Sequence, residues 1–307
     1  MAEAPGPDLW PPLPLDGWAD TYATLHRWTQ VVGKVRLART PWVNHSWHVT
    51  LYLTARGLTT GLIPHDRESF QIDFDFVDHR LLVRATGGAA ADLDLRPRSV
   101  AAFYREVMEV LRDLGVETRI YPRPNELPDA TPFAEDESHA AYDPTAAHRV
   151  WQVLVQADRV LTAFRARFVG KSSPVHFFWG SFDLAVTRFS GRPAPPHPGG
   201  VPNLPDRVAR EAYSHEVSSA GFWPGGGAVP YAAFYSYAYP EPPGYKDAPV
   251  RPPGFYSPDL REFLLPYDAM RTAASPDEVL MAFLDDTYRA AADLGKWDRA
   301  TLERGAS

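Results

Sequence analysis

The chain has 307 residues, of which 45% are hydrophobic and 13% aromatic, enough apolar material for a large buried core. Its formal net charge of −7 disfavours a nucleic-acid-binding protein, because such proteins need a basic surface to neutralise phosphates. The absence of cysteine excludes disulfides, zinc–thiolate sites, iron–sulfur clusters and thiol nucleophiles.

The sequence shows neither a secretion signal nor a membrane span. No basic segment followed by a continuous apolar run occurs before Trp18. No window elsewhere approaches the run of about 18 apolar residues that a membrane span requires. We therefore expect a soluble, cytoplasmic protein with no membrane partner.

The N-terminal part of the chain predicts a helix, several strands and a second helix. Asp16 is a suitable N-cap for the first helix. Apolar and polar residues alternate over residues 45–53 and again over 69–85, which predicts strands with one buried face. Ser99 is the expected N-cap of the next helix, and Gly115 its end.

The C-terminal part repeats the order of strands and helices. Asp143, followed by proline, predicts the start of a long helix. Residues 172–192, 211–223 and 229–240 have the composition of strands. Ser275 begins a predicted capping box for the last helix.

These elements predict an α+β fold with antiparallel or mixed sheets and flanking helices. We expect two meander-plus-helix halves, residues 1–120 and 143–301, joined by a proline- and acid-rich connector at 121–142 and followed by a tail at 302–307. The halves are expected to form one compact unit. A weak internal similarity is compatible with duplication, and shared architecture without common ancestry explains it equally well.

Residues 172–192 look like a buried strand, yet they contain His176, Asp183 and Arg188. In a regular strand, Asp183 shares a face with Trp179, whereas Arg188 lies on the opposite face. An unpaired buried carboxylate costs several kcal/mol, so Asp183 needs a partner from another segment or a raised pKa. Both an active site and a structural clamp fit this pattern.

Three predicted strands each contribute a histidine, namely His48, His176 and His215. Neighbouring strands lie roughly 5 Å apart, so these imidazoles can converge, with Glu216 or Asp183 as a carboxylate ligand. Such a set suits zinc, iron, manganese or nickel. No H-E-x-x-H or H-x-H spacing supports a metal site, and single histidines in strands more often have structural roles.

A row of tyrosines on one face of residues 229–240 allows two interpretations. The row comprises Tyr231, Tyr235, Tyr237 and Tyr239. Such a row is more often part of a core whose hydroxyls reach the rim, and the alternative is the wall of a ligand pocket. The residues expected to contact a ligand in such a pocket are Trp179, His48, Tyr52, Tyr235 and Tyr237.

Motifs for common cofactors and nucleophiles are absent. The sequence has no G-x-S-x-G elbow, no P-loop and no dinucleotide fingerprint, so no nucleotide cofactor is indicated. A divalent transition metal is the one cofactor that the histidines suggest. The basic residues Lys34, Arg36 and Arg39 are expected on a solvated helix face.

Two functions from different classes remain open. In the first, the protein is an enzyme acting on a small organic molecule in an aromatic-lined pocket. His176 or His215 would be the base or metal ligand, Asp183 or Glu216 the acid or orienting group, and Arg188 an anion clamp. In the second, the protein is a non-catalytic small-molecule binder whose charged residues only satisfy one another. No pattern indicates the reaction class or the oligomeric state.

Several segments resemble, nearly end to end, a bacterial family of uncharacterised proteins, the domain of unknown function 5996. The segments that carry the resemblance are TLHRWTQVVGKVRLA, NHSWHVTLYLTARGLTTG, FDFVDHRLLVR, SPVHFFWGSFDLAVTRFSGR, EAYSHEVSSAGFWPGG and EFLLPYD. The resemblance implies a relationship and no particular activity.

Overall fold

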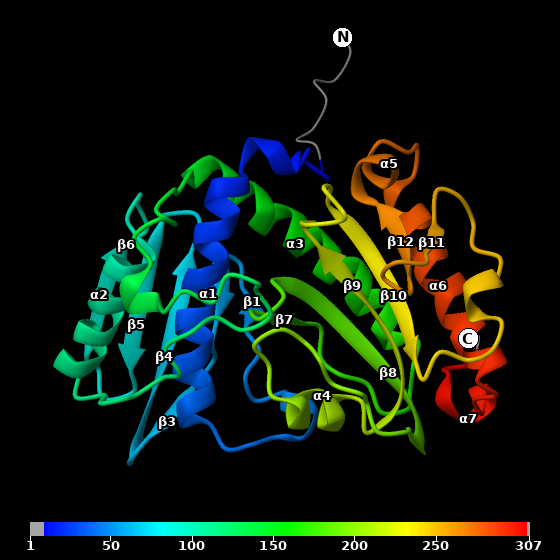
Figure 1. Ribbon diagram of the computed structural model, residues 1–307, viewed down its shortest axis with the longest axis horizontal. Coiled ribbons are helices and arrows are strands. Elements are labelled where there is room, and N and C mark those ends of the chain that lie inside the picture. The colour runs from blue at the N-terminus through cyan, green and yellow to red at the C-terminus, as the bar shows by residue number, and fades with distance from the viewer. Residues whose placement is uncertain (1–8, 306–307) are drawn as a thin grey trace, which may run out of the picture.

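The structure is a computed structural model, and it describes residues 9–305. Within these residues it has seven α-helices and two antiparallel six-stranded sheets, which confirms the predicted α+β class (Figure 1). The helices are α1 (Ala19–Arg39), α2 (Val100–Asp113), α3 (Pro144–Ala166), α4 (Asp206–Ala212), α5 (Tyr267–Arg271), α6 (Pro276–Leu294) and α7 (Arg299–Leu302). None of these helices is long and apolar enough to cross a membrane.

The N-terminal sheet has the strand order β1-β2-β4-β5-β6, with β3 paired to β4. Its strands are β1 (Tyr52–Leu53), β2 (Gly57–Thr59), β3 (Ile63–His65), β4 (Glu68–Asp75), β5 (Arg80–Ala85) and β6 (Ala90–Asp94). The predicted alternation along β4 is confirmed, because Phe70, Ile72 and Phe74 are buried. Phe74 packs near Phe103 of α2, whose ring stacks on Trp28 of α1.

The C-terminal sheet has the strand order β7-β8-β9-β10-β12-β11. Its strands are β7 (His176–Phe178), β8 (Asp183–Pro193), β9 (His215–Trp223), β10 (Ala233–Tyr239), β11 (Phe255–Ser257) and β12 (Glu262–Pro266). Backbone hydrogen bonds of 2.9 and 2.8 Å between Leu51 and Phe177 join the two sheets at their edges. One cluster of buried hydrophobic residues includes members of both sheets. The two strand orders differ, so the suggested duplication is not confirmed.

The two faces of the C-terminal sheet have different surroundings. Helices α3 and α6 pack against β8, β9 and β10 on one face. Arg188 points to that face and lies against Phe164 of α3 and Tyr288 of α6. Figure 1 shows α3 behind this sheet and α4 in front of it. The front face, which carries Asp183, is the one that borders a cavity.

Two of the four predicted N-caps are confirmed. The side chains of Ser99 and Asp143 each accept a backbone N–H from the first turn of α2 and α3, respectively. Asp16 instead lies in a short 3-10 helix before α1, which begins after Trp18. Ser275 precedes α6 as predicted but makes no side-chain capping bond, so the capping box is wrong.

Two predicted strands are wrong because each is interrupted by a turn. His45 and Ser46 have φ values of 60° and 59°, a left-handed conformation that no strand accommodates. Only the last two residues of 45–53 therefore form a strand. Residues 172–192 form the hairpin of β7 and β8, and Phe182 in its turn has a φ of 58°. This hairpin places Trp179 in the turn between β7 and β8.

Candidate functional site

A cavity of about 700 Å³ lies on the front face of the C-terminal sheet. Alternate residues of three neighbouring strands form its floor, including Asp183 and Thr187 of β8, Ser219 of β9, and Tyr235 and Tyr237 of β10. Its walls come from α1, α4, the β7–β8 turn and loops around residues 42–49 and 121–126. A volume of this size is typical of sites for small organic molecules.

Asp183 forms a buried hydrogen-bond network at one end of this floor. Its side chain is 7% exposed, and its two carboxyl oxygens accept short hydrogen bonds from the hydroxyls of Ser181 and Tyr235. Burial raises the pKa of Asp183, and the two donated hydrogen bonds oppose that shift. Tyr235 stacks on Tyr237, whose hydroxyl is 2.9 Å from the hydroxyl of Tyr213. Asp183 therefore has a partner from another strand, and that partner is a tyrosine.

Glu126 brings a second carboxyl group to the cavity from the connector. Its backbone has a φ of 62°, and its N–H donates to the carbonyl of Pro202 at 2.9 Å. Among the described residues, no side chain or backbone group hydrogen-bonds to its carboxyl. Burial raises the pKa of Glu126 to about 7, and the nearby Asp183 adds to this shift whereas Lys34 opposes it. Such a carboxyl group can both donate and accept a proton near neutral pH.

Lys34 of α1 supplies a buried amine to the same cavity. Its side chain is 2% exposed, and its Nζ donates a short hydrogen bond to Oδ1 of Asn125. Nζ also lies 5.3 Å from the ring centroid of Tyr121 and 5.4 Å from that of Trp179. Burial lowers the pKa of Lys34 to about 8, and the charge of Glu126 opposes this shift. The cavity thus combines an amine and a carboxyl group that both titrate near neutrality.

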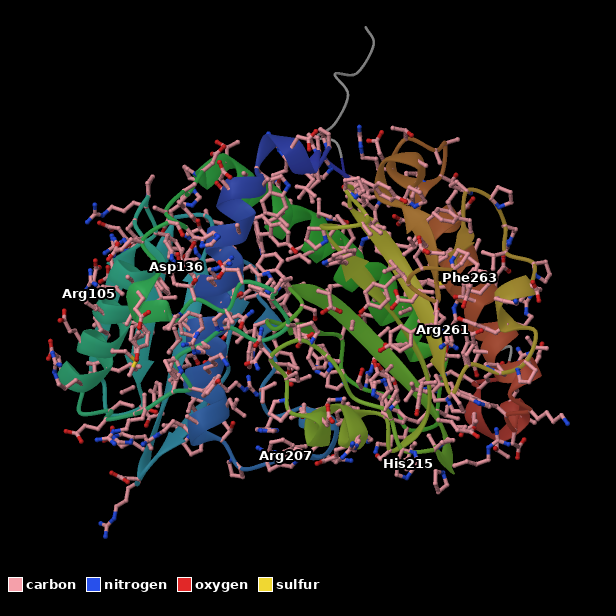
Figure 2. The ribbon with its side chains drawn as sticks, viewed as in Figure 1. Arg105, Asp136, Arg207, His215, Arg261 and Phe263 are labelled. Carbon is pink, nitrogen blue, oxygen red and sulfur yellow. The ribbon has the colours of Figure 1, made fainter. Side chains whose placement is uncertain are left out.

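Two predicted catalytic histidines lie outside the cavity. His176 is 1% exposed and its Nδ1 is 3.2 Å from the hydroxyl of Thr50. Burial lowers the pKa of His176 to about 3, so its imidazole is neutral at physiological pH and a poor base. His215 lies at the start of β9, at the lower edge of the molecule in Figure 2, where Ser214 hydrogen-bonds to it at 3.0 Å.

Glu216 and Arg188 also lie outside the cavity. Glu216 pairs with Arg192 at 2.6 Å on the face of β9 that points away from the cavity. Arg188 lies among aromatic rings on the helix-covered face and donates to the carbonyl of Phe164. Of the five predicted catalytic residues, only Asp183 borders the cavity.

The three histidines predicted as metal ligands are not brought together. The turn at His45 keeps the following residues out of the sheet, so His48 never becomes a strand neighbour of His176 and His215. His48 instead accepts the backbone N–H of Val43 at 3.2 Å. In residues 9–305, no three His, Asp or Glu side chains are placed to hold a metal ion together. The predicted set therefore does not form the metal site that strand pairing suggested.

The residues predicted to contact a ligand divide into two groups. Trp179, Tyr235 and Tyr237 border the cavity, so these tyrosines face an open space and not a helix. His48 and Tyr52 are not among the residues that line it. Tyr52 packs instead beside the ring of His176.

Sequence reasoning missed Lys34 and Glu126. Lys34 was predicted on a solvated helix face, but α1 is buried on most sides. A usable signal was present, because Arg27, Gln30 and Lys34 recur at helical spacing and form a polar stripe. All three contact the connector, through Asp129, Asp136 and Asn125. Such a stripe inside a buried helix indicates a buried polar partner.

The sequence matches the model of a family of unknown function, DUF5996, over residues 10–304. The chain belongs to the DUF5996 family. No curated protein and no solved structure matches it. The matched range includes both sheets and every residue that lines the cavity of this DUF5996 protein.

Replacing Gly180 by alanine in this DUF5996 protein should displace the Glu126 carboxyl group. An added Cβ would lie 2.1 Å from Oε1 of Glu126, the movable end of a side chain. We expect a small change in unfolding free energy and a loss of about 10²-fold in any reaction in which Glu126 takes part, because misplacing a reacting group by about 1 Å has that effect. Gly17→Ala is the control, since its Cβ would meet nothing closer than 3.8 Å. Equal activity of both variants would contradict the placement of Glu126.

Arg188 should prove structural in this DUF5996 protein. Its guanidinium carbon lies 3.5 Å from the ring centroid of Phe164 and 4.3 Å from that of Tyr288. Arg188→Met preserves much of this packing, so urea unfolding should show a change within about 1.5 kcal/mol. Arg188→Ala leaves a cavity and should cost about 2–4 kcal/mol. A stable Arg188→Met variant that no longer binds or converts a molecule taken up by the cavity would contradict this purely structural role.

Proposed function

We propose that this protein is an enzyme that acts on a small organic molecule in the cavity, with Glu126 transferring a proton. One observation carries the proposal: the cavity is lined by a partly buried carboxyl group that accepts no hydrogen bond from the described residues, beside the buried amine of Lys34. A carboxyl group kept only for stability is expected to be hydrogen-bonded or paired. Glu126 also has a left-handed backbone, and such strain is concentrated at functional sites.

The other lining residues suit the binding of an organic molecule. Trp47, Trp179 and Phe189 offer apolar ring surface for a flat or apolar part of the substrate. Asp183 and Tyr235 lie on the floor and offer polar atoms that can orient its polar groups. Asp183 thus keeps the orienting role expected from the sequence, whereas proton transfer passes to Glu126.

A non-catalytic binding protein is the second candidate. It is favoured by the hydrogen bonds of Asp183, because both of its oxygens already have protein donors. The charged side chains of such a protein would pair with one another and take no part in chemistry, and the rings of Tyr235 and Tyr237 would hold the ligand.

Incubation with a cellular small-molecule extract distinguishes these functions. Mass spectrometry would compare the extract after exposure to the parent protein and to Glu126→Gln. We expect the parent protein to consume one compound and form another, and the variant to bind that compound without converting it. A compound bound and returned unchanged by both proteins would identify a binding protein. Equal conversion by both proteins would show that Glu126 does not transfer the proton.

A further inference from the structure

We propose that Lys34 forms a covalent imine with the carbonyl carbon of the substrate, which makes aldehydes and ketones the substrate class. This inference rests on the proposed function, because it takes the cavity to be the active site. It assigns Lys34 the role of nucleophile and Glu126 that of its acid–base partner.

The surroundings of Lys34 differ from those of a structural lysine. Buried ammonium groups are usually paired with a carboxylate. Among residues 9–305, no carboxylate lies within ion-pair distance of the Lys34 amine, whose hydrogen-bond acceptor is the neutral amide of Asn125. The hydrogen bond to Asn125 therefore fixes the orientation of the amine, and no carboxylate partner stabilises its charged form.

Asn125 is itself fixed, so the direction of the amine is defined. The backbone N–H of Asn125 donates to Oε1 of Gln30 at 2.7 Å, and Nε2 of Gln30 donates to the backbone carbonyl of Asn125 at 2.9 Å. Its side-chain amide donates to the carbonyl of Asn203. Three contacts from two other segments thus hold the acceptor that positions Nζ of Lys34. Such preorganisation is what a reacting group needs.

The small number of lysines in the chain also supports a special role for Lys34. The chain has 31 lysine and arginine residues, and its only lysines are Lys34, Lys171, Lys246 and Lys296. The last three are exposed, whereas Lys34 is buried in the cavity wall. Arginine cannot lose its proton in a protein, but a desolvated lysine can. The one lysine buried in the cavity wall, among the described residues, is thus of the type that can become a neutral nucleophile.

The chemistry is balanced with the groups present. The lone pair of the neutral Lys34 amine forms the N–C bond while the carbonyl π electrons move to oxygen, and that oxygen takes up a proton released by the nitrogen. Protonated Glu126 then donates its proton to the carbinolamine hydroxyl. The C–O bond breaks, water leaves, and the nitrogen keeps one hydrogen as an iminium beside the Glu126 carboxylate. The pKa values of about 8 for Lys34 and about 7 for Glu126 allow both required forms near neutral pH.

Reductive trapping tests the imine without knowledge of the natural substrate. Benzaldehyde and sodium cyanoborohydride are added to the folded protein at about pH 7.5, and benzylated lysines are located by peptide mass spectrometry. We expect Lys34 to be modified about tenfold faster than the exposed Lys246 and Lys296, because more of its amine is neutral. Lys171 is left out of the comparison, since burial lowers the pKa of its amine as well. Modification of Lys34 at or below the rate of Lys246 and Lys296 would overturn the proposal.

Variants separate the chemistry from the fold. Glu126→Gln should slow the trapping of Lys34 without changing that of the exposed lysines, and Glu216→Gln, outside the cavity, should change neither. Lys34→Arg keeps a positive charge and should abolish both trapping at this position and conversion. If Lys34 is not trapped but Glu126-dependent conversion is found in the extract, the imine is wrong and the proposed enzyme stands. If both are absent, both proposals fail.

Discussion

Replacing Glu126 by glutamine should lower the rate of substrate conversion by about 10²–10⁴-fold, the usual contribution of a positioned general acid or base. Glutamine has nearly the same shape, so it fits against Gly180 as the glutamate does. It cannot take up or release a proton at any relevant pH. The measurement is the initial rate of conversion of the compound identified in the extract, at saturating concentration.

The pH dependence of this rate provides a second readout. Burial raises the pKa of Glu126 to about 7, so the parent rate should change most steeply near that pH. The residual rate of Glu126→Gln should lack this transition. Glu262→Gln is a matched control, because Glu262 also has a pKa raised to about 7 by burial but is not among the cavity-lining residues. A Glu126→Gln variant with more than half of the parent rate would exclude proton transfer by Glu126.

The sequence predicted best those elements whose local signals agree with their packing. Helices α2 and α3 begin at Ser99 and Asp143 because each side chain caps a free backbone N–H and an apolar stripe follows. Strand β4 was found because one of its faces is buried and the other is not. In these segments, local preference and tertiary environment favour the same structure.

The turns at His45 and Phe182 were missed for the opposite reason. Non-glycine residues adopt a left-handed backbone only when the surrounding structure imposes it. The ring of His45 packs between Trp47 and Phe189, and the ring of Phe182 packs against Phe177. Tertiary contacts therefore impose the left-handed backbone of His45 and Phe182. The Gly180-Ser181 pair, by contrast, is a local signal for the hairpin turn that the strand prediction overlooked. The same two turns separate His48 from the sheet and place Trp179 at the cavity.

The candidate site was predictable only in the part that lies on the strands. A carboxylate in an apolar strand needs a partner, so Asp183 stood out, and the tyrosines of β10 provided it. Glu126 lies in a proline- and acid-rich segment whose composition is typical of an exposed loop. Its burial results from contacts with Gly180 and Pro202, far away in the sequence. Lys34 and Asn125 are likewise 91 residues apart, so their pairing needs the assembled fold.

The stability difference between the parent protein and Glu126→Gln should depend on pH. The folded-state pKa of Glu126 is about 7, above its ordinary value of 4.5, so folding favours the protonated form. Below pH 4.5 the carboxyl group is protonated in both states and has no ionisation penalty. As the pH rises from 4.5 to 7, the unfolded state ionises first and is stabilised, which lowers the unfolding free energy by up to about 3 kcal/mol. Glutamine does not titrate, so the variant escapes this loss.

Urea unfolding of both proteins at pH 4.5 and pH 8 measures this effect. The comparison between proteins is needed because His26 and His176, whose pKa values burial lowers to about 4 and about 3, act in the opposite direction. Their contributions are present above pH 6.5 and are lost as the pH falls, equally in both proteins. We expect Glu126→Gln to gain up to about 3 kcal/mol relative to the parent between pH 4.5 and pH 8. Glu262→Gln should show the same trend while retaining activity, since desolvation likewise raises the pKa of Glu262 but its carboxyl group does not line the cavity. A difference between parent and Glu126→Gln that does not change with pH would mean that Glu126 titrates alike in the folded and unfolded states, and would remove the physical basis for its role as the proton-transferring group.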